Sequence, residues 1–80
     1  MDMTNKKIKD SKELEFAIFC VEEVAASLGA DAERVFSALT KKSNILYDYI
    51  VPEYEVLHTQ SKDYITNEIL DVMREKGVTV

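Results

Sequence analysis

Apolar residues recur at helical spacing along most of this chain, and no stretch alternates apolar and polar residues as a strand would. The clearest repeat precedes Gly29, and its apolar residues are Leu14, Phe16, Ala17, Ile18, Phe19, Cys20, Val21, Ala25 and Leu28. This pattern predicts a first helix from about Ser11, with Leu14, Ile18 and Leu28 in its buried stripe. Gly29 suits the left-handed residue that follows a last turn. The chain should therefore be all-α.

Two shorter helices are predicted between Gly29 and Pro52. Asp31 is a good N-cap for the first of them, and the predicted buried face of that helix is Ala32, Val35, Phe36 and Leu39. Ser43 and Asn44 offer another turn and cap before a second apolar group, Ile45, Leu46, Tyr49 and Ile50. Proline disfavours helical geometry at the residue before it, so we expect this short helix to end at Val51.

The last helix is predicted from about Ser61. Its buried stripe should consist of Ile65, Ile69, Val72 and Met73. Gly77 should end the helix, and Val78 is then placed to fold back on it.

The segment from Pro52 to Gln60 has two interpretations. If Pro52 is the first residue of a helix, a single helix of more than about 20 residues runs on through Ile65 and Ile69. If Thr59 or Ser61 is an N-cap, the segment before it is a packed loop or a single turn. We favour the break, because Thr and Ser hydroxyls compete for backbone groups and prefer helix caps to helix interiors.

These segments predict one domain over residues 11–80, a compact bundle of about four helices, after a flexible tail at residues 1–10. The tail carries few apolar anchors and no signal-peptide pattern, and no apolar run in the 80 residues approaches the roughly 20 needed to span a bilayer. We therefore expect a cytoplasmic protein.

One cysteine and one histidine cannot form a disulfide or complete a structural zinc site, so we expect no metal or other cofactor.

The first two predicted helices resemble a helix-turn-helix hairpin, "VAASLGADAERVFSAL". A DNA-binding helix-turn-helix protein needs hydrogen-bond donors on the exposed side of its second helix and cations around that helix. Here that helix offers Glu33, Arg34, Ser37 and Thr40, with basic charge only at Lys41 and Lys42. The net charge of −5 also opposes binding to a phosphate backbone. DNA contact, and then only together with a partner, is our second hypothesis.

The stretch "YEVLHTQSKDY" holds the only histidine of the chain. His58 and Asp63 are five residues apart, which misses the same-face spacing of three or four on a helix. No glycine-rich phosphate loop or nucleophile elbow is present. We therefore expect His58 to hydrogen-bond a neighbouring helix end and the protein to have no catalytic residue. A small-ligand or enzymatic site centred on His58 is the third hypothesis.

Four tyrosines crowd around that stretch, and tyrosine is common both at binding surfaces and at the rim of small cores. If this cluster is a binding surface, the candidate partner-binding residues are Tyr47, Tyr54, His58, Gln60 and Tyr64. Asp48, Glu53 and Glu55 add negative charge nearby, so a partner there would be basic. If the tyrosines instead form the rim of the core, they are structural, and the three acidic residues only make the protein more soluble.

The pieces "ELEFAIFCVEEVAASLGADAERVF", "KKSNILYDYIVPEYEVLHTQSKDYI" and "LDVMREKGV" resemble an uncharacterised family of short bacterial proteins, the domain of unknown function 3791. Its members look like partners encoded beside other small proteins, some resembling ADP-ribosyltransferase toxins. The resemblance implies an intracellular protein-interaction module, antitoxin-like or adaptor, whose partner is the product of a neighbouring gene. It leaves open which protein that is and whether the chain forms an oligomer.

Overall fold

The computed structural model describes residues 11–80, and the predicted tail at residues 1–10 lies outside this range. The described chain forms four α-helices, α1 (Ser11–Leu28), α2 (Ala32–Thr40), α3 (Tyr54–Leu57) and α4 (Lys62–Glu75), and a π-helix, η2 (Leu46–Ile50). Residues 11–80 contain no strand, so the all-α prediction is confirmed. None of their helices is long and apolar enough to cross a membrane.

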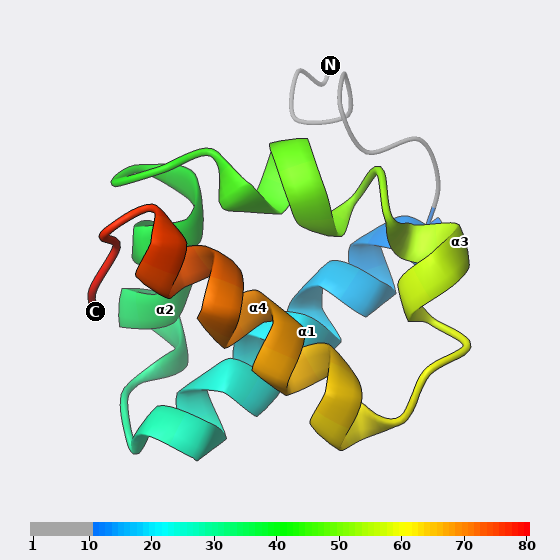
Figure 1. Cartoon of the computed structure of the whole chain (residues 1–80), viewed down its shortest axis with the longest axis horizontal. Helices are drawn as coiled ribbons and strands as arrows, with labels where there is room; N and C mark the ends of the chain where they lie inside the picture. The colour runs from blue at the N-terminus through cyan, green and yellow to red at the C-terminus, as the bar shows by residue number, and fades with distance from the viewer. Residues whose placement is uncertain (1–10) are drawn as a thin grey trace.

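The two longest helices, α1 and α4, cross in the middle of the molecule (Figure 1). Helix α2 packs beside the C-terminal half of α1, and η2 and α3 close the remaining sides (Figure 1). The side chains of one continuous core come from all five segments, and the largest of those that are fully buried are Val24, Val35, Leu39, Ile45, Leu46, Ile50 and Ile69. Each segment thus contributes apolar area that it could not bury alone, which is what stabilises so short a chain.

Both glycines end helices, as predicted. Gly29 and Gly77 have φ of 67° and 69°, in the left-handed region that residues with a Cβ rarely adopt. After Gly29, the Ala30 amide donates to the Ala25 carbonyl at 3.0 Å, and after Gly77 the Val78 amide donates to the Met73 carbonyl at 2.8 Å. These are the six-to-one bonds of the Schellman motif. Val78 consequently folds back and packs against the core.

The chain breaks between α3 and α4, as the favoured interpretation predicted. Ser61 is the N-cap, and its hydroxyl accepts a hydrogen bond from the Tyr64 amide at 3.1 Å. Thr59 instead donates its hydroxyl to the Val56 carbonyl at 2.8 Å at the end of α3. Of the two candidate caps, Ser61 therefore begins the last helix.

The short helix predicted before Pro52 is η2, and it lies where expected. The expectation that Pro52 would prevent helical geometry at Val51 is wrong. Val51 keeps helical angles, φ −67° and ψ −48°, directly before Pro52, and its amide donates to the Leu46 carbonyl at 2.9 Å. The wider π-helical turn accommodates this geometry. Beyond Pro52 the chain continues through turns into α3.

The predicted buried stripe of α1 is partly wrong, because Leu14, Ile18 and Leu28 are about half exposed. The buried face is formed by Phe16, Ala17, Cys20, Val21, Val24 and Ala25. Helix α2 has 9 residues and α1 has 18, so at about 1.5 Å per residue α2 reaches only half the length of α1. The N-terminal half of α1 therefore keeps Leu14 and Ile18 uncovered, whereas Leu28, at the C-terminal end of α1, borders a separate hollow beside α4.

The buried face of α2 also differs in part from the predicted face. Val35, Ala38 and Leu39 are buried, whereas Ala32 and Phe36, which were predicted to be buried, are exposed. Asp31 takes the N-cap position, although its side chain makes no cap hydrogen bond. On α4, Ile65, Ile69 and Met73 are buried as predicted, and Val72 is half-buried.

Candidate functional site

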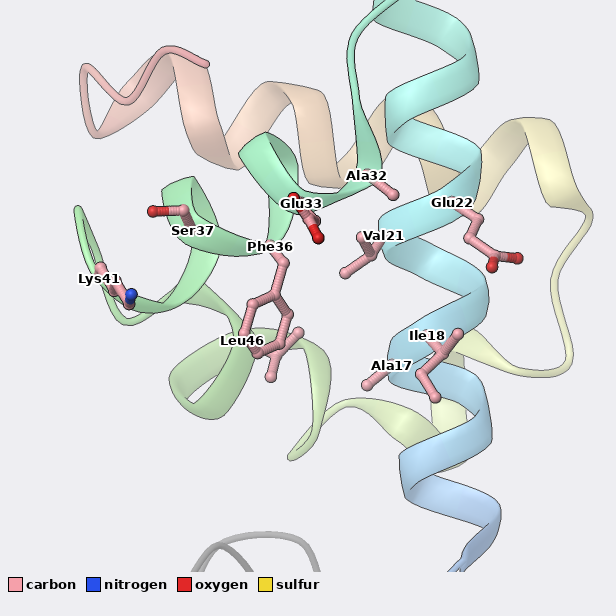
Figure 2. Close-up of a pocket in the computed structure, with 10 residues that line it drawn as sticks. All are labelled: Ala17, Ile18, Val21, Glu22, Ala32, Glu33, Phe36, Ser37, Lys41 and Leu46. Carbon is pink, nitrogen blue, oxygen red and sulfur yellow. The ribbon is translucent and has the colours of Figure 1, made fainter.

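A groove runs between α1 and α2 on the surface that α2 leaves open (Figure 2). Its volume is about 470 Å³, and its lining residues are Ala17, Ile18, Val21, Glu22, Ala32, Glu33, Phe36, Ser37, Lys41 and Leu46. We call it the α1–α2 groove. Ala17, Val21 and Leu46 form its floor, and they also belong to the core. A ligand in this groove would thus rest directly on the packed interior.

Two large apolar side chains project into the α1–α2 groove from opposite helices. Ile18 on α1 is 48% exposed and Phe36 on α2 is 47% exposed. In Figure 2 the Phe36 ring extends from α2 to the position of Leu46 in the groove, and Ile18 lies on the α1 side of the same groove. Leu14, one helical turn before Ile18, is also half exposed and extends the apolar strip along α1. Covering these side chains would remove apolar surface from water.

Three charged residues also line the α1–α2 groove. The Glu33 carboxylate extends into the space between the helices and faces Val21, whereas Glu22 points away from α2 (Figure 2). Lys41 lies at the end of the groove beyond Ser37 (Figure 2). The Glu33 carboxylate forms no hydrogen bond or ion pair with any residue between 11 and 80. Glu33 is therefore an unneutralised charge above an apolar floor.

The second surface of interest is the tyrosine segment, residues 47–64, which contains the five candidate partner-binding residues. Tyr47 and Tyr54 are half-buried and pack against the core, whereas Gln60 and Tyr64 are exposed. The Tyr54 ring meets Phe16 of α1 edge-on, with 5.3 Å between ring centroids. Of the candidate tyrosines, Tyr64 is the exposed one, with 46% of the residue accessible to solvent.

His58 stacks on Tyr54, with ring centroids 4.6 Å apart and an interplanar angle of 15°. Its imidazole forms no hydrogen bond with another described residue, so the predicted bond to a helix end is wrong. The backbone explains the stacking, because His58 and Tyr54 are four residues apart on α3 and its C-cap. The structure therefore brings Tyr54 and His58 together, and among residues 11–80 no hydrogen bond or ion pair joins His58 to Asp63.

Tyr49 ties the tyrosine segment to α4. Burial, and next the charge of the Glu68 carboxylate, raise the pKa of Tyr49 above its ordinary value of 10.0. Glu53 and Tyr64 make smaller contributions in the same direction, and the Glu68 side chain lies near the Tyr49 hydroxyl. This pair anchors η2 on α4, which is a structural role for part of the segment.

Cys20 is fully buried, as predicted, and burial raises the pKa of its thiol from 9.0 to about 12, with a smaller effect of Glu23. A thiol in this state is a poor nucleophile, because the thiolate is the reactive form. No group of three His, Cys, Asp or Glu residues within the described range could hold a metal ion.

Sequence reasoning missed the α1–α2 groove, because it placed Ile18 and Phe36 in the core. One signal in the sequence pointed to it. The apolar face of the first helix was wider than the stripe of about three residues in seven that a single packing surface requires. The apolar residues beyond that stripe include Leu14 and Ile18, which form the exposed apolar strip along α1.

The family described as "Protein of unknown function (DUF3791)" matches residues 15–76, from the second turn of α1 to the end of α4. No curated protein and no solved structure matches the chain.

Proposed function

Since the chain belongs to the DUF3791 family, whose description gives no activity, we propose that it is a protein-interaction module that binds a partner in the α1–α2 groove. The single observation that carries this proposal is the pair of half-exposed side chains, Ile18 and Phe36, above the apolar floor of the groove. Large apolar side chains that gather beside a hollow mark surfaces where another molecule docks.

The shape of the groove favours a protein segment as the occupant. Two helices form its walls, as in the grooves that receive an amphipathic helix. A pocket for a small polar ligand would bring several polar groups together, but here Glu33 is the one charged group that points into the space between the helices (Figure 2). The partner-binding role then needs no catalytic residue.

We assign the module to the cytoplasm of a bacterium, as an adaptor or antitoxin-like partner of a small protein encoded nearby. What supports this assignment is the resemblance to short bacterial proteins that are encoded beside other small proteins. The groove adds support for the partner-binding part of this assignment.

DNA contact together with a partner ranks second. The observation in its favour is the hairpin of α1 and α2, whose turn at residues 29–31 is as short as that of a helix-turn-helix. Arg34 is exposed on α2, but Glu33 lies beside it and Phe36 occupies the same helix. A helix that presents these side chains is a better fit to a protein than to a phosphate backbone.

The test compares the full-length protein with its Phe36→Ala variant. Affinity capture from the native host identifies a partner, and isothermal titration calorimetry then measures its binding to each purified protein. We expect Phe36→Ala to weaken binding by at least about tenfold while the fold is retained. Val56→Ala is the matched control, because Val56 is an exposed apolar residue outside the groove. Equal affinities for wild type and Phe36→Ala would contradict the proposal.

A further inference from the structure

We infer that the occupant of the α1–α2 groove is an amphipathic helix of a partner protein that places a lysine or arginine against Glu33. This inference rests on the proposed function and adds the chemical class of the partner. It follows from the position of the Glu33 carboxylate between the two helices, above Val21 and beside Phe36 (Figure 2).

Glu33 is exposed in the free protein, so water solvates its charge. A segment that covers Ile18 and Phe36 also covers the space into which Glu33 extends, and it removes this water. A carboxylate that loses water without gaining a cation is strongly unfavourable. Among residues 11–80, Lys41 is the only cation that lines the groove, and it lies at the other end and forms no ion pair with Glu33 (Figure 2). The partner must therefore supply the positive charge.

The overall charge favours the same class of partner. The chain carries 15 acidic and 10 basic residues, a net charge of −5, so a basic segment is attracted from a distance. Glu22 lines the α1 edge of the groove, and its carboxylate adds negative charge on the outer side of α1 (Figure 2). A second copy of the chain would bring the same negative charge to the contact, which makes self-association in the groove the less favourable arrangement.

The apolar strip determines the shape of the partner. Leu14 and Ile18 are four residues apart on one face of α1, and Ile18 and Phe36 line the same groove. A helix with apolar residues at positions i, i+3, i+4 and i+7 would place them along such a strip. The basic residue would lie beside this apolar stripe, where it reaches the Glu33 carboxylate.

The experiment uses two synthetic helical peptides and the full-length protein. Both peptides carry leucines at i, i+3, i+4 and i+7, and they differ only in the residues beside this stripe, which are lysine in one and glutamate in the other. Fluorescence anisotropy measures their binding. We expect the lysine peptide to bind at least about tenfold more tightly, and its affinity to fall as salt is added.

Two matched variants separate a local ion pair from general attraction. Glu33→Gln and Glu55→Gln each remove one negative charge, but Glu55 lies on α3, outside the groove. The preference for lysine should fall to about twofold or less in Glu33→Gln and should be retained in Glu55→Gln. An equal loss in both variants would overturn the inference, because it would show that only net charge matters.

The remaining outcomes separate this inference from the proposed function. If neither peptide binds while a native partner binds in a Phe36-dependent way, the inference is wrong and the proposed function stands. If the lysine peptide binds equally well to Phe36→Ala, both are wrong, because the groove is not the site. If the protein alone forms a dimer that Phe36→Ala dissociates, the occupant is a second copy and the inference is overturned.

Discussion

The α1–α2 groove and the tyrosine segment are both rich in large apolar side chains, but the fold uses them in opposite ways. In the tyrosine segment, Tyr47, Tyr49 and Tyr54 pack against the core. In the groove, Ile18 and Phe36 lie outside the core and about half of each is exposed. The composition of the tyrosine segment suggested a binding surface, but most of its tyrosines instead stabilise the fold. What distinguishes a docking surface is apolar area that the fold leaves uncovered.

The largest expected difference between the two regions is in stability. Leu57 is a buried residue of the tyrosine segment, so Leu57→Ala should lower the free energy of unfolding by about 2 to 5 kcal/mol. Ile18→Ala in the groove should cost less than about 1 kcal/mol, because half of the side chain is already exposed. Urea denaturation followed by circular dichroism measures both values. If Ile18→Ala proved as costly as Leu57→Ala, Ile18 would belong to the core.

A smaller difference is expected within the tyrosine segment itself. Tyr54→Ala removes the edge-on contact with Phe16 and the stacking on His58, and should cost about 2 kcal/mol. Tyr64→Ala removes an exposed ring and should change stability by less than about 0.5 kcal/mol. Thermal and urea unfolding of the two variants would check this order. The reverse order would mean that Tyr54 is free to serve as a binding residue.

The break before α4 lies within the tyrosine segment, and the N-cap at this break gives a third prediction. Ser61→Ala should destabilise the protein by about 1 kcal/mol, because the Tyr64 amide loses its acceptor. Thr59→Ala is the control, since the Thr59 hydroxyl bonds to the end of α3 and should matter by less than about 0.5 kcal/mol. Equal effects measured by urea unfolding would place the cap elsewhere.

The smallest effect is expected at Tyr49 and depends on pH. The pKa of Tyr49 is raised in the folded protein, so the folded state keeps its proton where the unfolded state has lost it. This contribution to stability is complete below the ordinary pKa of 10.0 and is lost as the pH rises through the raised value. Solvent screens a half-buried pair, so the change should be modest.

Tyr49→Phe should therefore flatten the decline in stability on the alkaline side. Urea unfolding between about pH 9 and about pH 11 would measure the slope for both proteins. An unchanged slope in Tyr49→Phe would show that the contact with Glu68 does not hold η2 on α4.

Most of the architecture followed from the sequence, because local signals decide where helices begin and end. Gly29 and Gly77 end helices through left-handed geometry that other residues rarely adopt. Ser61 begins one through a hydroxyl that reaches the backbone. Such signals act within a few residues and need no knowledge of what packs on the helix.

The candidate site could not be predicted in this way, because exposure depends on the lengths and positions of other helices. Ile18 fits the periodicity of a buried stripe, but α2 is half as long as α1 and leaves it uncovered. Tyr54 looked like a binding residue, but its ring reaches Phe16, 38 positions earlier in the chain. Periodicity identifies an apolar face, and only tertiary packing decides which part of that face remains exposed.

The most direct test of the central claim is site-specific photocrosslinking in the native host. The photoreactive amino acid p-benzoylphenylalanine replaces Phe36 in one strain and Tyr64 in another, two aromatic residues of nearly equal exposure, 47% and 46%. If the α1–α2 groove is the binding surface, the probe at position 36 should give an adduct with one dominant partner and the probe at position 64 should not. An adduct formed at position 64 but not at position 36 would contradict the account and return the binding surface to the tyrosine segment.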